Sequence, residues 1–567
     1  MLLLLLSFAA CHAARVPNSP FPVAARGLNA SQTLRVVYTD GLSPADAFTL
    51  QALQGVVNKG APTLARVARG AELWLNATRE IWGVSLDYSV GTLPALVALF
   101  RPSLAGYVLC ALDDNSTNAA VAAAAALNVL VVTPENAALA SAAQLPLLYD
   151  VRGRGAQWAI DTFNATPGGS GFTFSRSVTT MQLPSESACC MADYSVAMGV
   201  LQWWPDGGDN VTGAVGRRVW ESLRPPFAML GWGPDELGTV AAVSAYGGGV
   251  AASNWAANLD VLSNFDVPAL QPRAAAAPAA PAAPVHTVCF LVSDGDNVQF
   301  LLDGFATDAR WWGSPARGSV PLGWTLSAPV RCAPLLLRGR LAQTGPSNPA
   351  APPPPPTHTQ QAVDLCPVVP AYLYASARSD GFVAGVSGAG YFYPDDVLAS
   401  AGAGPAALDA LTALSAGFMA KAGLRVANVL ARGNGVPAEA AESYLRHEGV
   451  DALIWYPYSD YSGLRGGITW SSGGKPIIGG RFNLWGDGSN PAGPTFKNVT
   501  GLAEALLAMP RNPAVPEGYS LVPLHAWSHT PADAAAVMAL LSAAAPGAVQ
   551  AVTPAEFVAR VVANVKR

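Results

Sequence analysis

The sequence has few charged residues. Asp, Glu, Lys and Arg make up 13% of its 567 residues, and the net charge is -5. This low content of positive charge gives no electrostatic basis for binding nucleic acid. We therefore expect no nucleic-acid partner. The scarcity of charge and the presence of 15 Trp and 15 Tyr favour a neutral partner, because aromatic rings stack on the C–H faces of sugars.

Several motifs of other protein classes are also absent. The chain has no Gly-x-Ser-x-Gly elbow after a strand, no His-Glu-x-x-His and no P-loop. After the N-terminus, no apolar run is long enough to span a membrane. Residues 119–132 come closest, and their pattern is that of an alanine-rich helix followed by a strand. We therefore expect no membrane span.

The N-terminus predicts secretion. Five leucines after Met1 lead into small residues up to Ala14, which is the pattern of a signal peptide over residues 1–14 that is too short to cross a bilayer. Six Asn-x-Ser/Thr sites agree with a secreted glycoprotein. They are Asn29, Asn76, Asn115, Asn164, Asn210 and Asn498.

Cysteine is scarce, with seven in the chain. Loss of Cys11 with the signal peptide leaves six, an even number that suits an oxidising compartment. Cys332 and Cys366 flank a single insertion and are the pair we expect to be bonded. The adjacent Cys189 and Cys190 are expected to be bonded separately, or simply buried, rather than to form a redox switch.

The chain divides at an Ala/Pro-rich stretch. Residues 272–284 have the composition of a linker. Before it, strand and helix patterns predict two small α/β domains over 30–150 and 151–271. After it, about eight apolar strand candidates alternate with helices, which predicts a C-terminal (β/α) TIM-like barrel of seven or eight units over 285–567. The low-complexity segment 334–364 is expected to be a surface insert of this domain.

The strongest site candidate follows the first strand after the linker. The apolar run Val288 to Val292 continues into Ser293-Asp294-Gly295-Asp296-Asn297. Barrel enzymes place catalytic groups at this end of a strand, and two carboxylates can divide the roles of acid and of base or nucleophile. Asp294, Asp296 and Asn297 could instead bind Ca²⁺ or Mg²⁺, or form an Asx turn that caps the next helix.

A second acidic candidate, Glu236, lies in the earlier domain. It follows the strand pattern 227–231 and a Gly-Trp-Gly-Pro-Asp turn. It would reach the barrel only if the second domain packs over the barrel mouth. The nearby Trp255 and Asn258 could belong to the same site, or could be a packed tryptophan and a helix cap.

Aromatic and amide residues recur at other strand ends. Because these ends would lie together at one face of a barrel, they predict a single carbohydrate cleft. Trp324 and Trp455 are expected to be its stacking walls. The further candidates for substrate binding are Tyr456, Arg481, Asn483 and His525. The alternative is structural: loop ties for the arginine and the asparagine, and a satisfied core position for the histidine.

The stretch Gly388-Ala389-Gly390-Tyr391-Phe392-Tyr393-Pro394 follows a buried-strand pattern with a glycine turn that presents two tyrosines. It matches letter for letter the signature of the GxGYxYP family of glycoside hydrolases, which the chain resembles over most of its mature length. Family sequences are also similar around Asp294 and Asp296, which favours a site there. We expect Tyr391 and Tyr393 to position the sugar; the alternative is a tyrosine pair packed in the core.

The resemblance implies a glycoside hydrolase. For that activity, the paired carboxylates Asp294 and Asp296 are the candidates for the acid and for the nucleophile or base. Two other hypotheses fit the same residues. A metal-dependent carbohydrate esterase or deacetylase would hold a divalent cation at Asp294, Asp296 and Asn297, with help from His525. A non-catalytic carbohydrate-binding surface protein would keep the aromatic residues alone. Outside the esterase hypothesis, no cofactor is expected.

Overall fold

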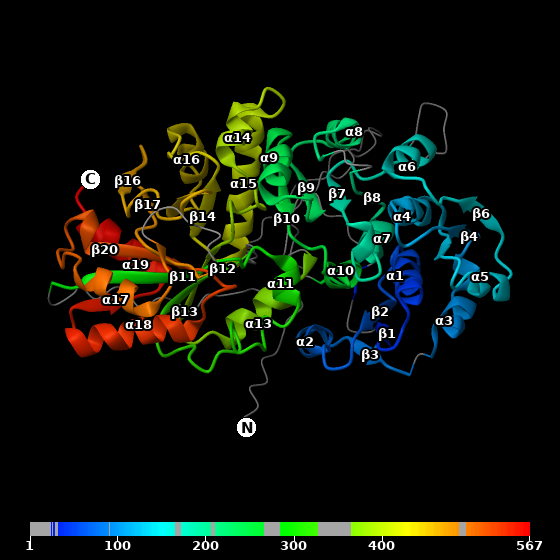
Figure 1. Cartoon of the computed structure of the whole chain (residues 1–567), viewed down its shortest axis with the longest axis horizontal. Helices are drawn as coiled ribbons and strands as arrows, with labels where there is room; N and C mark the ends of the chain where they lie inside the picture. Colours follow the sequence, from blue (N-terminus) through cyan, green and yellow to red (C-terminus); the bar gives the residue numbers. More distant parts are fainter. Residues whose placement is uncertain are drawn as a thin grey trace, which may run out of the picture.

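The computed structural model describes residues 24, 27–28, 32–89, 91–164, 172–205, 210–265, 284–326, 365–486 and 495–567. In this part of the chain the fold is α/β, as predicted. Figure 1 shows an elongated molecule, with the N-terminal half on one side and the C-terminal half on the other. The predicted signal peptide, Asn29, Cys332, nearly all of the linker and the insert 334–364 lie outside these ranges, so those assignments stay predictions.

The first predicted domain contains two separate parallel sheets rather than one layer. Their strands lie in the orders β2-β1-β3 and β5-β4-β6. Helix α1 (Pro44–Asn58) is buried along nearly its whole length and contacts β5, so a helix separates what the sequence suggested was one sheet. The strands are β1 (Thr33–Tyr38), β2 (Leu64–Val67), β3 (Ser85–Asp87), β4 (Tyr107–Leu109), β5 (Leu130–Val132) and β6 (Leu147–Asp150), and the other helices are α2 (Leu73–Trp82), α3 (Leu93–Leu99), α4 (Ser116–Leu127) and α5 (Ala138–Ala142). Helix α6 (Ala156–Phe163) follows, at the start of the second predicted domain.

The second predicted domain is built on a third parallel sheet, of order β10-β9-β7-β8. One hydrophobic core runs through both predicted domains, since Phe48, Val131, Met181 and Val196 belong to the same buried cluster. The two therefore pack as a single lobe. Its remaining elements are β7 (Val178–Met181), α7 (Ala192–Met198), β8 (Leu201–Trp203), α8 (Ala214–Ser222), β9 (Phe227–Gly231), α9 (Glu236–Ala245), β10 (Gly248–Ala251) and α10 (Leu259–Leu262).

The C-terminal lobe is a curled, mainly parallel sheet. Its neighbours follow the order β17-β15-β14-β13-β12-β11-β20-β18, so β20 returns to the side of the first strand, as in a barrel. In the described residues no ladder joins β17 to β18, and the sheet is open there. The strand order is that of a (β/α) barrel, while the number of units stays a prediction. Every residue of β11 is buried, which is typical of a parallel sheet covered on both faces.

The strands of this lobe are β11 (His286–Val292), β12 (Leu322–Leu326), β13 (Asp380–Ala384), β14 (Val426–Ala431), β15 (Ala452–Pro457), β16 (Ile468–Trp470), β17 (Pro476–Gly479), β18 (Asn483–Leu484), β19 (Thr495–Phe496), β20 (Tyr519–Leu524) and β21 (Val549–Ala551). The helices are α11 (Val298–Leu302), α13 (Val368–Ser376), α14 (Pro394–Ala399), α15 (Gly404–Ala422), α16 (Ala438–Leu445), α17 (Val499–Leu507), α18 (Pro531–Ala544) and α19 (Pro554–Asn564). Helix α18 begins with a capping box in which Thr530 and Asp533 bond each other's backbone.

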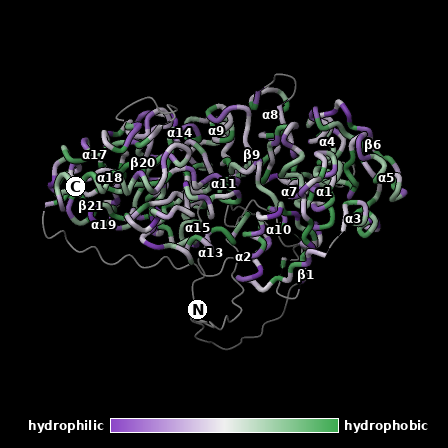
Figure 2. The backbone as a smooth tube through the Cα atoms, turned by 60° about the horizontal axis from the view of Figure 1, so that its bottom comes forward, coloured by the Kyte–Doolittle hydropathy of each residue, from purple (hydrophilic) through white to green (hydrophobic). Residues whose placement is uncertain are grey.

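Hydrophobic and hydrophilic residues are interspersed along the chain in both lobes (Figure 2). Among the described residues, no helix is both long enough and apolar enough to cross a membrane.

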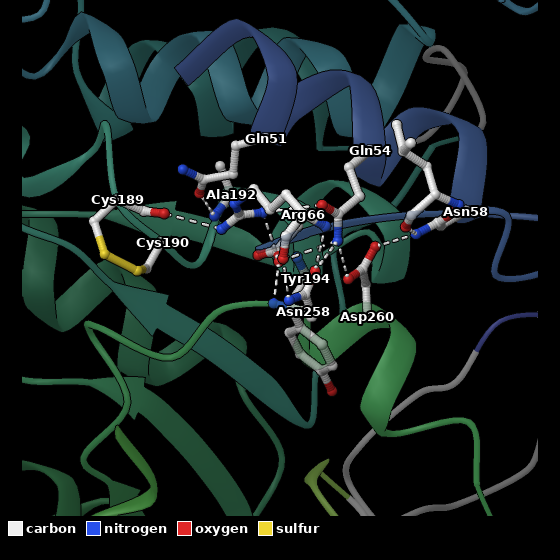
Figure 3. A network of polar contacts seen from close by, with 12 residues as sticks. Gln51, Gln54, Asn58, Arg66, Cys189, Cys190, Ala192, Tyr194, Asn258 and Asp260 are labelled. Atoms are coloured by element: carbon white, nitrogen blue, oxygen red, sulfur yellow. Dashed lines mark hydrogen bonds and ion pairs between the residues drawn. A yellow bond between two sulfur atoms is a disulfide. The ribbon is translucent and has the colours of Figure 1, made fainter. Parts of the chain in front are cut away.

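Cys189 and Cys190 form a disulfide with each other, so the prediction of separate bonding was wrong (Figure 3). The other cysteines in the described residues, Cys110, Cys289 and Cys366, are each buried and form no disulfide there. Two hydrogen bonds hold the turn: Cys189 N donates to Glu186 O at 3.0 Å, and the side-chain Nη2 of Arg66 donates to Cys189 O at 2.9 Å.

We expect this bond to be detectable in the native protein. Alkylation without a reductant should leave Cys189 and Cys190 unlabelled, and the peptide that carries both should be lighter by two hydrogens than its reduced form. Peptide mass spectrometry before and after treatment with a thiol measures this directly. Labelling of either residue before reduction would contradict the pairing.

Candidate active site

A cavity of about 450 Å³ lies where the N-terminal lobe meets the C-terminal sheet. In Figure 1, α9 and β10 stand between the lobes, beside α11 and α14. The cavity is therefore lined from both sides. Its lining residues are Trp232, Glu236, Asn254, Trp255, Leu291, Ser293, Asp294, Asp296, Asn297, Gln299, Thr325, Val386, Tyr391, Asn428, Leu430, Tyr456, Tyr461, Pro523 and Trp527.

The loop after β11 brings three of the predicted residues, Asp294, Asp296 and Asn297, to the cavity. The loop is tight. Gly295 N donates to Thr325 Oγ1 at 2.9 Å, and a Cβ at Gly295 would lie 1.6 Å from the carbonyl oxygen of Thr325. Only glycine fits this approach, so the packing of the loop on β12 fixes where its flanking carboxylates point.

Asp296 lies in an unusual electrostatic environment. Burial, which is the largest cause, and the negative charges of Asp294 and Glu236 together raise its pKa to about 7, against the opposing effect of a backbone hydrogen bond. A carboxyl group with this pKa carries a proton for much of the time at neutral pH, so it can donate that proton to a leaving group.

Glu236 reaches the same cavity from the N-terminal lobe. It is the first residue of α9, and the N-cap Asp235 accepts a hydrogen bond from Gly238 N at 2.5 Å. Burial raises the pKa of Glu236, and Asp294 adds to this. Tyr391 Oη, which donates to Glu236 Oε1 at 2.8 Å, opposes the shift. Glu236 could reach the strand ends only if the second predicted domain packs over them. The structure shows this packing.

The motif Gly388–Pro394 joins the two lobes. Tyr391 pairs with Val250 of β10 through two backbone hydrogen bonds of 2.8 and 2.9 Å. Gly388 and Gly390 have φ of +86° and +124°, which a residue with a side chain rarely adopts. Tyr391 lines the cavity, as expected for a residue that positions a sugar. Tyr393 is fully buried behind it, with the two hydroxyl oxygens 3.3 Å apart, so Tyr393 supports Tyr391 and does not contact the cavity.

Both predicted stacking walls were wrong, because side chains alternate along a strand. On β12, Thr325 lines the cavity, so Trp324 points away from it and donates its indole N–H to Asp380 at 2.9 Å. On β15, Tyr456 lines the cavity, and Trp455 is buried in the core on the opposite face. Tyr456 thus lies at the cavity, where its contact with substrate stays a prediction, and the two tryptophans belong to the core.

Three polar candidates also lie outside the cavity lining. Arg481 donates to the carbonyl oxygens of Tyr519, Gly466 and Pro516, and so ties loops together. Asn483 donates to Ser462 and Thr495 at 3.3 Å each. His525 stacks on Trp485 with ring centroids 3.8 Å apart and lies 3.0 Å from Ser528 Oγ. These three side chains have the structural roles that the sequence left as the alternative.

The aromatic rim consists instead of Trp255 and Trp527. Their side chains are 54% and 49% exposed, and both line the cavity. Trp527 packs on Phe300, with ring centroids 4.7 Å apart, and meets Trp311 edge-on at 5.7 Å. Trp255 N donates to Gln299 Oε1 at 3.2 Å. Each exposed indole therefore projects from a fixed position on a different lobe.

Sequence reasoning missed Asn428 and Tyr461. Asn428 lines the cavity from β14, is 4% exposed, and its Oδ1 has no hydrogen-bond partner in the structure. The signal was available, because Asn428 is the one polar residue in the buried strand Val426–Ala431. Tyr461 stacks on Tyr456 with centroids 5.1 Å apart, and only the fold brings it to the cavity.

A buried polar network anchors the chain segment that supplies Asn254 and Trp255 (Figure 3). Arg66 forms an ion pair of 3.0 Å with Asp193, whose other contacts include the backbone N–H of Asn258 at 2.8 Å. Asn258 Nδ2 donates to Arg66 O at 2.7 Å. Asn258 is therefore part of this network and does not line the cavity.

No three His, Cys, Asp or Glu side chains approach closely enough to hold a metal ion in the described ranges. The loop after β11 offers two carboxylates and one amide, and a cation there stays a prediction.

Comparison with known families extends these observations. The model of the "GxGYxYP putative glycoside hydrolase C-terminal domain" matches residues 284–346 and 357–561. The "GxGYxYP_N second domain" and the "GxGYxYP third domain" match residues 104–166 and 176–264. Among curated proteins, no sequence matches the chain significantly.

A solved structure described as a putative hydrolase from Bacteroides thetaiotaomicron VPI-5482 has a similar fold. Its TM-score with this chain is 0.79 at 22% sequence identity, and the match covers 97% of this chain and 98% of that one. The two proteins thus share the whole architecture, the N-terminal lobe included.

Proposed function

The chain belongs to the GxGYxYP family, as its signature predicted, and we propose that it is a hydrolase that cleaves a glycosidic bond. One observation carries the proposal: Glu236, Asp294 and Asp296 line a single cavity, although they come from two lobes. Glycoside hydrolysis uses two carboxyl groups that flank the scissile bond, one as an acid and the other as a base or nucleophile.

Asp296 is the proposed general acid. Its raised pKa, near 7, supports this role because the group can hold a proton at neutral pH and release it to the leaving oxygen as the bond breaks. The proton would pass from the carboxyl oxygen of Asp296 to the glycosidic oxygen.

Glu236 is the proposed base or nucleophile. It enters the cavity from α9, whereas Asp296 enters from the loop after β11, so the two can approach a bound sugar from different sides. The hydrogen bond from Tyr391 supports the charged form of Glu236 and orients its free oxygen. Asp294 would then act through its charge, which raises the pKa of both other carboxyl groups.

The proposal is tested by turnover of wild-type protein on a panel of plant, algal and bacterial glycans, assayed by release of reducing ends. We expect cleavage of at least one glycan, and the same rate after treatment with a chelator. Activity lost to the chelator and restored by a divalent cation would favour the esterase or deacetylase hypothesis. Glycan binding without turnover would favour the carbohydrate-binding protein.

The charge of Asp294 should be visible in the pH profile. In the Asp294→Asn variant one negative charge is lost, so the pKa of Asp296 falls, and the alkaline limb of kcat/KM moves to lower pH. We expect a shift of about one pH unit, the size of a typical effect of a neighbouring charge. An alkaline limb at the wild-type position would show that Asp294 does not act on the acid. Rates from pH 4 to 9 give this measurement.

We also propose that the protein is secreted. The apolar segment at residues 1–14 and the six Asn-x-Ser/Thr sites support this.

A further inference from the structure

The cavity has negative charge with no positive counterpart. Among the described residues, its lining contains three carboxyl groups, those of Glu236, Asp294 and Asp296, and no Lys, Arg or His. In the low-dielectric surroundings of a cavity these charges act strongly on a bound ligand. An acidic sugar would therefore meet like charges at short range and find no cation to balance its own.

The uncharged polar groups of the lining also favour hydrogen-bond donors on the ligand. The Oδ1 atoms of Asn254 and Asn428 have no hydrogen-bond partner in the described part of the chain, and both residues are more than nine-tenths buried. The orientation of the Asn254 amide is fixed, because its Nδ2 donates to Glu186 Oε2 at 3.0 Å. These two amide oxygens can each accept a hydrogen bond from a ligand in the cavity.

Some donors of the lining are used within the protein. The hydroxyl of Tyr391 is directed to Glu236, and that of Thr325 donates to Val292 O at 3.0 Å. Gln299 Nε2 donates to Asn297 Oδ1 at 3.4 Å. The hydroxyl of Tyr456 has no partner among the described residues, so the lining keeps a donor as well. The acceptors that remain, which are the carboxylates and the two amide oxygens, suit a ligand with hydroxyl or amine groups.

The two tryptophans at the rim of the cavity favour a long ligand. In the described residues, two tryptophans are markedly exposed, Trp255 and Trp527. They stand on different lobes at one cavity, and a chain of several sugar rings would cover both.

From these observations we infer the substrate class: an oligosaccharide or polysaccharide whose sugars carry hydroxyl or amine groups and no acidic group. The inference rests on the proposed function only in that the ligand is a glycan. Glu236 and Asp294, together with Asp296 when it has lost its proton, repel uronic acids and sulfated sugars. The two amide oxygens accept hydrogen bonds from the ring inside the cavity, and the two tryptophans hold the adjoining rings.

Binding tests this inference separately from catalysis. The ligands are tetrasaccharides of glucose, glucosamine and glucuronic acid in both anomeric forms, which differ mainly in the group that sets their charge. Calorimetry with the full-length Asp296→Asn variant, which retains Glu236 and Asp294, prevents turnover during the measurement. We expect the glucose tetrasaccharide to bind, and the glucosamine tetrasaccharide to bind at least as tightly as it does. The glucuronic acid tetrasaccharide should bind about 100-fold more weakly than the glucose one, since like charges in contact cost several kcal/mol.

Two further variants assign the effect to the named residues. Removal of a second charge, in Asp294→Asn combined with Asp296→Asn, should strengthen binding of the acidic tetrasaccharide about ten-fold. Trp527→Ala should weaken binding of the neutral ligand about ten-fold, whereas Leu540→Ala, which removes an exposed apolar side chain on α18, should have no effect.

Each result decides the inference. Equal binding of acidic and neutral tetrasaccharides would overturn it while leaving a glycoside hydrolase in place. Absence of binding by all the tetrasaccharides would overturn it as well, and absence of turnover on the glycan panel would then overturn the proposed function too.

Discussion

We expect Asp296→Asn to lower kcat by about 10²- to 10⁴-fold, the usual contribution of a general acid. The amide has nearly the shape of the carboxyl group but cannot release a proton to the leaving oxygen. Because Asp296 lies among two other carboxylates in the cavity, no neighbouring group of opposite charge would collapse into its place. Rates on a natural glycan, compared with those of the wild type, give the measurement.

The leaving group shows whether the loss belongs to acid catalysis. A dinitrophenyl glycoside of the same sugar departs without protonation, so Asp296→Asn should retain most of its activity on that substrate. The matched control is Asp303→Asn, which alters an exposed carboxylate near α11 that does not line the cavity. Equal losses on both substrates would assign Asp296 a different role, such as the nucleophile.

The same variant should be more stable than the wild type at alkaline pH. The pKa of Asp296 is near 7 in the folded protein, against about 4 in an unfolded chain, so the folded state loses stability as the pH rises between these values. Asparagine does not ionise, and the gain at pH 8 should reach about 2 kcal/mol, after allowance for water that enters the cavity. The gain should vanish below pH 4. Unfolding midpoints at the two pH values also show that the loss of activity is not a loss of fold.

The sequence predicted the parts of the site that depend on short stretches of chain. The loop Ser293–Asn297 and the motif around Tyr391 combine a buried strand with a tight turn, and the structure places both at the cavity. The predicted walls Trp324 and Trp455 failed for a local reason, the two-residue alternation of a strand. Had the sequence shown which face of each strand is covered by helices, the predicted cavity residues would have been the neighbours Thr325 and Tyr456 instead.

The contribution of the N-terminal lobe could not be derived in the same way. Glu236 and Trp255 enter the cavity only because β10 pairs with Tyr391, a contact between residues far apart in the chain. Nothing near Glu236 in the sequence specifies that pairing. The buried network around Arg66 is a similar case, since its members come from α1, β2, α7 and the segment before α10.

Arg66→Met should destabilise the N-terminal lobe by about 3–5 kcal/mol, the cost of removing one partner of a buried ion pair. The side chains of Arg66 and Asp193 are 5% and 0% exposed, and no water reaches the charge that remains. Burial and Asp193 already raise the pKa of Asp260, beside them, to about 8, and Arg66 opposes that shift. Without Arg66, the pKa of Asp260 rises further, and the buried carboxylate of Asp193 has lost its ion-pair partner. Thermal unfolding followed by tryptophan fluorescence measures the loss.

Two controls separate the buried charge from a general effect of replacing arginine. Arg446→Met removes an exposed ion pair with Asp409, whose side chains are each 49% exposed, and should cost less than about 1 kcal/mol. Asp193→Asn added to Arg66→Met removes the unpaired charge and keeps one oxygen, which can accept from the backbone N–H group of either Tyr194 or Asn258; in the wild type each of these groups bonds a different oxygen of Asp193. It should restore part of the stability, and further loss in the double variant would contradict a role for charge pairing.

The polar network around Arg66 also supports the wall of the cavity. Asn258 holds Arg66 and Asp193 together, and the chain just before it carries Asn254 and Trp255 to the cavity. Arg66→Met should therefore weaken glycan binding even at temperatures where the protein remains folded. The Asp193→Asn double variant should recover binding and stability together. Recovery of stability alone would show that the network supports the lobe without positioning the cavity wall.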